Sequence, residues 1–171
     1  MPRIIGIDPG LVSTGWGMID AEAGRLKFVA CGTINPNAKL GLAERLLQLH
    51  HALNAVIAQH QPHAAALEET FATANGASTL KLGQARGALL VTLAANGLAV
   101  GEYSAKVVKK ALVGTGGADK HQVSQMVGVL LPAGREALAA CKHDAADALA
   151  IAICHANFSK FEGGLPPPSL R

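Results

Sequence analysis

The chain has 171 residues, of which 50% are hydrophobic and 16% are charged, and its formal net charge is +3 at pH 7. This composition excludes a disordered chain, and the length suits one domain with a sizeable core better than two. The basic excess is compatible with a polyanionic partner but is too small to establish one.

Cysteine usage and hydropathy indicate the cellular compartment in which the protein is expected. Cys31, Cys141 and Cys154 form no CxxC pair, the N-terminus lacks the apolar run of a secretion signal, and no apolar run approaches the length of a membrane span. We therefore expect free thiols, a cytoplasmic location and no transmembrane segment.

The first 62 residues read as an antiparallel meander followed by a helix. RIIGID (3–8), TGWGMID (14–20) and LKFVACGTI (26–34) are expected as strands, with a turn at Pro9 and Gly10 and a polar connection at 21–25. Leucines then recur at helical spacing from Leu42 until Pro62 ends the pattern.

The remaining chain alternates between a strand and helices. AAALEE (64–69) is expected as a strand, 71–79 as a loop, 80–96 as a long helix ended by Gly97, and LAVGEY (98–103) as a strand. Helices at 104–112 and 120–131 flank a glycine hinge in which Asp119 is the expected N-cap, and a last helix begins near His143. We expect one domain over 1–161 and a disordered tail over 162–171.

This order predicts an α/β fold, with a mixed sheet of about five strands flanked by helices. Strands joined through helices run parallel, so the carboxyl ends of 3–8 and 64–69 are expected side by side. Those ends carry Asp8 and Glu68.

Each candidate acid also has an ordinary explanation. Asp8 precedes Pro-Gly and could be a turn residue, and Glu68 could be the first solvated residue of a loop, with Glu69 competing for any role. Asp144 and Asp147 could favour the positive end of a helix dipole.

Taken together, the acids predict a metal site. In HDAADALAIAI the three-residue spacing puts Asp144 and Asp147 on one helical face. Carboxylates that converge cannot all ionise at neutral pH without cations, and oxygen ligands without a cysteine or histidine cluster favour Mg²⁺ or Mn²⁺. Two such ions suit in-line cleavage of a phosphodiester. The predicted metal ligands of this nuclease are Asp8, Glu68, Asp144 and Asp147.

The residues assembled so far resemble the RuvC family of Holliday junction resolvases, which have a ribonuclease-H-like fold. The resemblance covers nearly the whole chain: GIDPG followed by TG.G, ALEETF, LKLGQARG, K..K...VG.G..DK.QV and DAADALAIAI stand in the family's order and spacing. It implies the same four metal ligands. Some relatives place a histidine at the position of Asp144, which makes His143 an alternative, but the three-residue spacing favours Asp144.

The resemblance also implies a function. It predicts a magnesium-dependent, structure-selective endonuclease that resolves four-way DNA junctions by paired symmetric cuts in recombination and repair. Two cuts of equal polarity need two active sites, so we expect a homodimer, with the small residues Gly83, Gly87 and Ala88 as a contact stripe or as an internal packing stripe. A branch-migration motor complex of the RuvA and RuvB type is the expected further partner.

Several residues are candidates for holding DNA. Phe71, in a loop of small residues, could stack on an unpaired base or belong to the core. Arg86 could contact DNA or cover an apolar helix with its stem. The resemblance places Lys109 and Lys120 at the rim of the active site, whereas a run of charges is more often a solvated face. The full set of candidate lysines is Lys81, Lys106, Lys109, Lys110 and Lys120.

Three rival functions remain open. IDPGLVSTG also resembles the phosphate-binding hairpin of sugar-kinase and actin-like ATPases, but these need a second such domain. A non-catalytic junction-binding protein would not need four acids. Another nuclease of the same fold, such as a YqgF-like RNA-processing enzyme, is disfavoured only by the full motif set.

Overall fold

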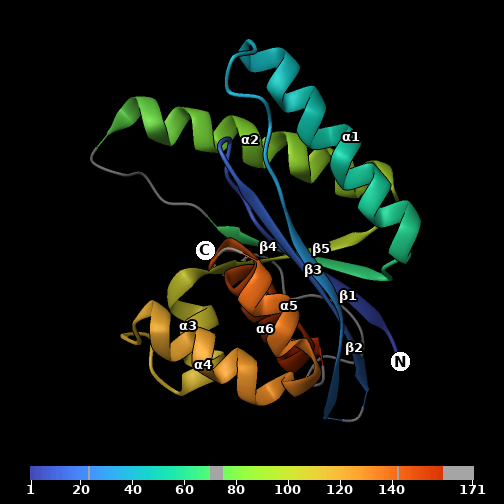
Figure 1. The fold of residues 1–171 in the computed structure, drawn as a ribbon, viewed down its shortest axis with the longest axis vertical. Helices are drawn as coiled ribbons and strands as arrows, with labels where there is room; N and C mark the ends of the chain where they lie inside the picture. Colours follow the sequence, from blue (N-terminus) through green and yellow to red (C-terminus); the bar gives the residue numbers. More distant parts are fainter. Residues whose placement is uncertain (23, 70–74, 142, 160–171) are drawn as a thin grey trace.

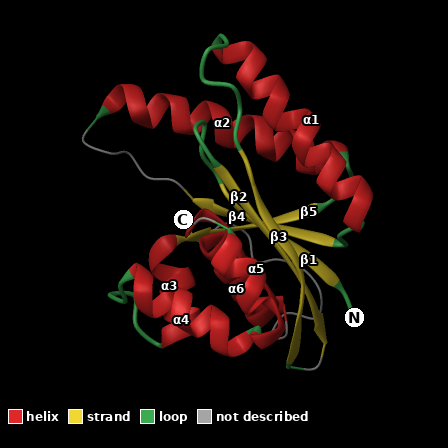
Figure 2. Ribbon diagram, in the orientation of Figure 1, coloured by secondary structure: helices red, strands yellow, loops and turns green. Residues whose placement is uncertain are grey.

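The structure, a computed structural model, describes residues 1–22, 24–69, 75–141 and 143–159 and consists of three layers. A central sheet lies between α1 and α2 on one face and α3, α4 and α6 on the other (Figure 1; Figure 2). The strands are β1 Arg3–Asp8, β2 Thr14–Glu22, β3 Arg25–Ile34, β4 Ala64–Glu69 and β5 Ala99–Ser104. The helices are α1 Leu42–His60, α2 Gly76–Ala95, α3 Ala105–Val113, α4 Lys120–Leu130, the 3-10 turn η1 Pro132–Gly134, α5 Arg135–Ala140 and α6 His143–Ser159.

The sheet has five strands in the order β3-β2-β1-β4-β5. The first three form the predicted antiparallel meander, and β4 runs parallel to both β1 and β5. The ladder between β1 and β4 ends at Ile7 and Leu67. Asp8 and Glu68, the next residues, therefore follow adjacent positions at one edge of the sheet, as predicted.

Helix α6 lies unusually close to β1 and β2 because both surfaces consist of small residues. A Cβ atom on Gly6 would lie 2.0 Å from the Ala148 carbonyl oxygen, and one on Gly15 would lie 2.0 Å from the carbonyl oxygen of Asp144. On the helix side, Ala145 and Ala148 are fully buried. The alanine-rich sequence of α6 thus sets its distance from the sheet, and with it the height of its two aspartates.

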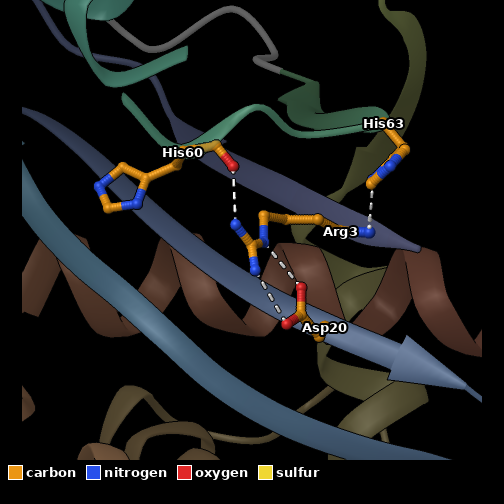
Figure 3. Close-up of polar contacts among 4 residues, drawn as sticks. All are labelled: Arg3, Asp20, His60 and His63. Carbon is orange, nitrogen blue, oxygen red and sulfur yellow. Dashed lines mark hydrogen bonds and ion pairs between the residues drawn. The ribbon is translucent and has the colours of Figure 1, made fainter. Parts of the chain in front are cut away.

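Arg3, the first residue of β1, forms hydrogen bonds to β2, to the last residue of α1 and to the residue before β4 (Figure 3). Its guanidinium donates to both carboxylate oxygens of Asp20 on β2, at 2.8 and 3.1 Å, and to the main-chain oxygen of His60 at 2.8 Å. Its main-chain N–H donates to Nδ1 of His63 at 3.0 Å. The end of α1 and the start of β4 are thereby fixed against the meander.

One prediction of local structure was wrong, and one segment was not predicted at all. Residues 76–79, expected as loop, form the first turn of α2, because the Asn75 side chain accepts hydrogen bonds from the N–H groups of Ala77 and Ser78 at 3.1 and 3.3 Å. The segment η1–α5 was not foreseen, since its helical turns are too short to show a period. The predicted tail over 162–171 lies outside the described residues, and the domain boundary after 161 stays a prediction.

Other local predictions are confirmed. Asp119 caps α4 by accepting from the N–H of Gln122 at 2.8 Å. All three cysteines are free thiols, and burial raises the pKa of Cys31 to about 12, so this thiol is neutral. In the described part of the chain, no helix has the length and apolar character needed to cross a bilayer.

Candidate active site

One pocket collects three of the four predicted metal ligands and both lysines expected at the rim of the active site. Asp8, Glu68 and Asp147 line it together with Lys109 and Lys120. Its remaining walls are apolar and come from three helices, α3, α4 and α6. The residues are Ala105, Val108, Val123, Ala150 and Ile151. Acidic and basic side chains thus share a pocket with apolar walls, beside which charges interact more strongly than they do in bulk water.

Four elements position these side chains. Asp8 and Glu68 come from the ends of neighbouring parallel strands, and Asp147 is held above them because α6 packs closely on β1 and β2. Lys109 lies on α3, and Lys120 is the first residue of α4, directly after the Asp119 cap. The glycine hinge between these two helices includes Gly114 with a φ of 82°, a left-handed conformation that suits glycine.

Burial, together with the closeness of other acids, governs the ionisation of the carboxyl groups in the pocket. Burial raises the pKa of Asp8 to about 8, with further contributions from the charges of Glu68, Asp147 and Asp144. Burial also raises the pKa of Glu68, while a hydrogen bond from the Asp8 side chain acts in the opposite direction. At neutral pH Asp8 is therefore protonated, and its O–H donates a hydrogen bond to the Glu68 carboxylate.

A lysine partly balances this negative charge. Lys120 Nζ lies 3.2 Å from Oδ2 of Asp147, and the Asp147 charge is the main cause that raises the pKa of Lys120. The Lys120 side chain is 78% exposed, so this pair adds little to folding stability. Its ammonium group is instead accessible to a ligand that enters the pocket.

Asp144 stands one turn before Asp147 on α6, outside the residues that line the pocket. Its charge nevertheless contributes to the raised pKa values of Asp8 and Lys120. The neighbouring His143 side chain is exposed. The four predicted acids therefore belong to one electrostatic group, with Asp144 at its border.

The donor set fits a hard divalent cation. Among the described residues, no three His, Cys, Asp or Glu side chains are gathered tightly enough to enclose an ion as they stand. The available donors are, however, all carboxylate oxygens, and burial among other acids raises the pKa of Asp8 to about 8. A divalent cation supplies compensating positive charge, and oxygen donors are those that Mg²⁺ and Mn²⁺ prefer.

The predicted DNA-contacting residues are distributed unevenly. Lys106 and Lys110 are exposed on α3, near the pocket, whereas Lys81 is exposed on α2 and lines a separate hollow with Leu11 and Gln84. Phe71 lies outside the described residues.

Arg86 is turned inward, away from the pocket. Its guanidinium pairs with Glu102 on β5 and its Nε donates to the main-chain oxygen of Glu68 at 3.1 Å. Glu102 was not among the predicted site residues. The signal that could have found it is an acid inside the apolar strand LAVGEY, which needs a buried partner.

Comparison with known proteins identifies the family. The family described as crossover junction endodeoxyribonuclease RuvC matches residues 4–155. A crossover junction endodeoxyribonuclease RuvC from Paramagnetospirillum magneticum is 59% identical over 155 residues, which cover 91% of this chain and 91% of that protein.

Solved structures agree with this match. A structure of Thermus thermophilus RuvC, 30% identical, superposes with a TM-score of 0.81 over 96% of this chain and 99% of that one. A second, of T. thermophilus RuvC in complex with Holliday junction substrate, is 29% identical and has a TM-score of 0.84 over 98% of this chain and 100% of that one. The ribonuclease-H-like fold and the family predicted from the sequence are both confirmed. The chain belongs to the crossover junction endodeoxyribonuclease RuvC family.

Proposed function

We propose that the chain resolves four-way DNA junctions by metal-dependent hydrolysis of phosphodiester bonds. Membership of a family of junction endodeoxyribonucleases gives the reaction class, and the similar T. thermophilus protein was solved with a Holliday junction. The observation that carries the proposal for this chain is the pocket in which Asp8, Glu68 and Asp147 face two lysines.

The cofactor of the proposed reaction is Mg²⁺, two ions per site, for which Mn²⁺ substitutes. The ligands are Asp8, Glu68, Asp144 and Asp147. When bound, such ions ready a water for in-line attack and stabilise the departing oxygen. The raised pKa of Asp8 supports this assignment, because a carboxyl buried beside other acids is ionised more readily when a divalent cation is bound to it.

The lysines act on the DNA backbone. Lys109 and Lys120 attract and orient the phosphate at the pocket, and the exposed Lys106 and Lys110 extend the positive surface along α3. Phe71 and Lys81 are proposed DNA contacts on the sequence argument alone. The proposed location is the cytoplasm, and a branch-migration motor complex is the proposed partner.

A homodimer supplies the second active site for paired cuts. The open surface of α2 supports this proposal, because a Cβ atom on Gly83 or Gly87 would meet nothing within 4 Å. Within one described chain, these glycines are therefore not an internal packing stripe, which was the alternative explanation of their sequence. A second copy of α2 is the proposed occupant of the stripe.

The rival functions make different demands. A junction-binding protein without chemistry has no use for a protonated carboxyl among other acids, and an ATPase of the related fold needs a second domain around its nucleotide. An RNA-processing nuclease would use the same acids, so the substrate must be separated by experiment.

The test compares synthetic four-way DNA, linear duplex DNA and structured RNA, each with Mg²⁺ and with EDTA. We expect paired symmetric cuts only in the four-way DNA and only with Mg²⁺. Asp8→Asn should reduce cutting at least ~10³-fold and leave junction binding intact, because a neutral amide cannot replace a carboxylate ligand. Asp20→Asn, on β2 and bound to Arg3, is the matched control and should cut normally. Wild-type cutting by Asp8→Asn would refute the ligand assignment, and preferential cutting of RNA would refute the substrate.

A further inference from the structure

Arg86 connects α2 to the strand that carries Glu68. Its Nε donates to the Glu68 main-chain oxygen at 3.1 Å, and its terminal nitrogen forms an ion pair with Glu102. The Arg86 and Glu102 side chains are only 20% and 31% exposed. We call these three groups, the Arg86 guanidinium, the Glu102 carboxylate and the Glu68 main-chain oxygen, the Arg86 bridge.

The bridge lies on the face of the sheet opposite to the active site. Side chains alternate along a strand, so Glu68 points to the α6 face with Asp8, while Leu67 and Glu69 point to the α2 face. On β5, Tyr103 packs in the α6-side core, which places Glu102 on the α2 face as well. Arg86 thus reaches Glu68 through the backbone and not through its carboxylate.

The hydrogen bond from Arg86 to Glu68 lies just beyond the point where β4 stops pairing with β1. The ladder with β1 ends at Leu67, one residue before Glu68, whereas the ladder with β5 continues to Glu69. The Arg86 hydrogen bond is an additional tether at the residue whose side chain enters the pocket. Strand ends that lose such a tether fray, and a catalytic side chain there loses its fixed position.

The charge and the planar shape of the guanidinium together explain why an arginine suits this position. The guanidinium lies among acids: Glu102 in direct contact and Glu69, whose charge also acts on it. Its planar fork can serve a carboxylate and a carbonyl together, which a lysine ammonium on a single flexible stem does poorly. These contacts use the Nε–H group and one terminal nitrogen of the guanidinium, and they hold it against β4 and β5.

We infer that Arg86 is a positioning residue that fixes Glu68 for cutting through the Arg86 bridge, and that it does not contact DNA. The inference rests on the proposed role of Glu68 as a metal ligand. It replaces the prediction of Arg86 as a DNA contact with a role on the other side of the sheet.

Arg86→Lys separates the two roles, because lysine keeps the charge that a phosphate contact requires and loses the fork. We expect single-turnover cutting at saturating protein to slow roughly 10- to 100-fold, as outer-shell substitutions at metal sites do. The affinity for junction DNA in EDTA, and its dependence on salt, should stay within about twofold of wild type, because no phosphate contact is lost. Amide hydrogen exchange at Leu67–Glu69 should become faster.

The matched control is Arg135→Lys. Arg135 also donates its Nε to a main-chain oxygen, that of Gly128 at 3.0 Å, but it does so on α5 and at an exposed position. This variant should cut and bind like wild type. Urea unfolding of both variants checks that each is folded under the assay conditions.

Two results would overturn the inference: wild-type cutting by Arg86→Lys, or weaker junction binding in EDTA by Arg86→Met with a salt dependence reduced by about one phosphate contact. Glu68→Gln, assayed in parallel, separates this failure from a failure of the proposed function. If Glu68→Gln cuts normally, the metal site itself is wrongly assigned. If Glu68→Gln is inactive while Arg86→Lys cuts normally, only the Arg86 bridge is refuted.

Discussion

The ionised carboxylate of Asp8 opposes folding, whereas the ionised carboxylate of Asp20 supports it. Asp8 is buried beside Glu68 and Asp147, and its pKa is raised to about 8 from 3.8. Asp20 accepts two hydrogen bonds from Arg3, which lower its pKa (Figure 3). A raised carboxyl pKa means that the folded chain holds a proton that the unfolded chain releases, so the two residues have opposite pH dependences.

Asp8→Asn is therefore expected to stabilise the protein in EDTA. Between the unfolded pKa of 3.8 and the folded pKa of about 8, wild type loses stability as pH rises, whereas the amide does not titrate. The free energy of unfolding of Asp8→Asn relative to wild type should rise on the order of 1–3 kcal/mol from about pH 5 to about pH 8.5, measured by urea unfolding.

Asp20→Asn is the control with the opposite sign. The lowered pKa of Asp20 contributes stability that is present above its unfolded pKa of 3.8 and lost only as pH falls below it. This variant should be less stable than wild type by a similar amount at both pH values. A pH-independent difference for Asp8→Asn as well would show that the pocket does not hold Asp8 protonated.

Among the elements, α6 has the greatest influence on the site, because its distance from the sheet sets the height of Asp144 and Asp147. That distance depends on glycines in the strands. A Cβ atom at Gly15 would lie 2.0 Å from the Asp144 carbonyl oxygen and 2.9 Å from the Asp144 Cβ. Neither atom is at the end of a flexible chain, so the helix itself must move to admit a side chain there.

Gly15→Ala should therefore impair both folding and cutting. Overpacking of this kind costs about 1–3 kcal/mol, measurable as a lower urea midpoint. Displacement of the first turn of α6 should also slow cutting by more than about 10-fold, as expected when catalytic groups shift by a fraction of an ångström. Gly128→Ala is the control, since a Cβ there meets nothing within 4 Å and should be neutral or stabilising. Unchanged cutting by Gly15→Ala would show that α6 does not position the acids.

For the whole molecule, the proposed paired cuts require a homodimer, because one chain offers one active site. Gly83 and Gly87 leave a surface stripe on α2 open among the described residues. Helix α2 belongs to the layer that covers one face of the sheet (Figure 1). If this stripe is the dimer contact, a bulky side chain will separate the copies without disturbing either fold.

Gly87→Leu is expected to convert dimer to monomer in light scattering and to replace paired cuts by single nicks. Gly128→Leu is the matched control, because Gly128 is also a helical glycine with open space around its Cβ position. Both substitutions should leave or raise the thermal stability of the chain, since glycine costs about 1 kcal/mol in a helix. A dimeric Gly87→Leu protein that still makes paired cuts would place the contact elsewhere.

Local patterns were sufficient to predict the five strands, most helices and the three acids that line the pocket, Asp8, Glu68 and Asp147. Hydrophobic period distinguishes strand from helix, and the rule that strands linked by a helix run parallel allows Asp8 and Glu68 to meet at one end of the sheet. The tertiary structure decides that they do meet, because it places β4 beside β1. The motifs, in their order along the chain, predicted the family. The structure confirms the predicted five-stranded sheet, and the comparisons confirm the family.

Contacts between distant side chains could not be predicted in this way. The hydrophobic period shows which face of α2 is apolar. It does not show that Arg86 contacts Glu102 and the Glu68 carbonyl on the α2 face of the sheet. Nor does it show that α6 lies on strand glycines, or that Lys120 and not Lys110 stands within 3.2 Å of Asp147. The reason is physical: an element's own sequence sets its local conformation, whereas the partner of a long polar side chain depends on where other elements pack.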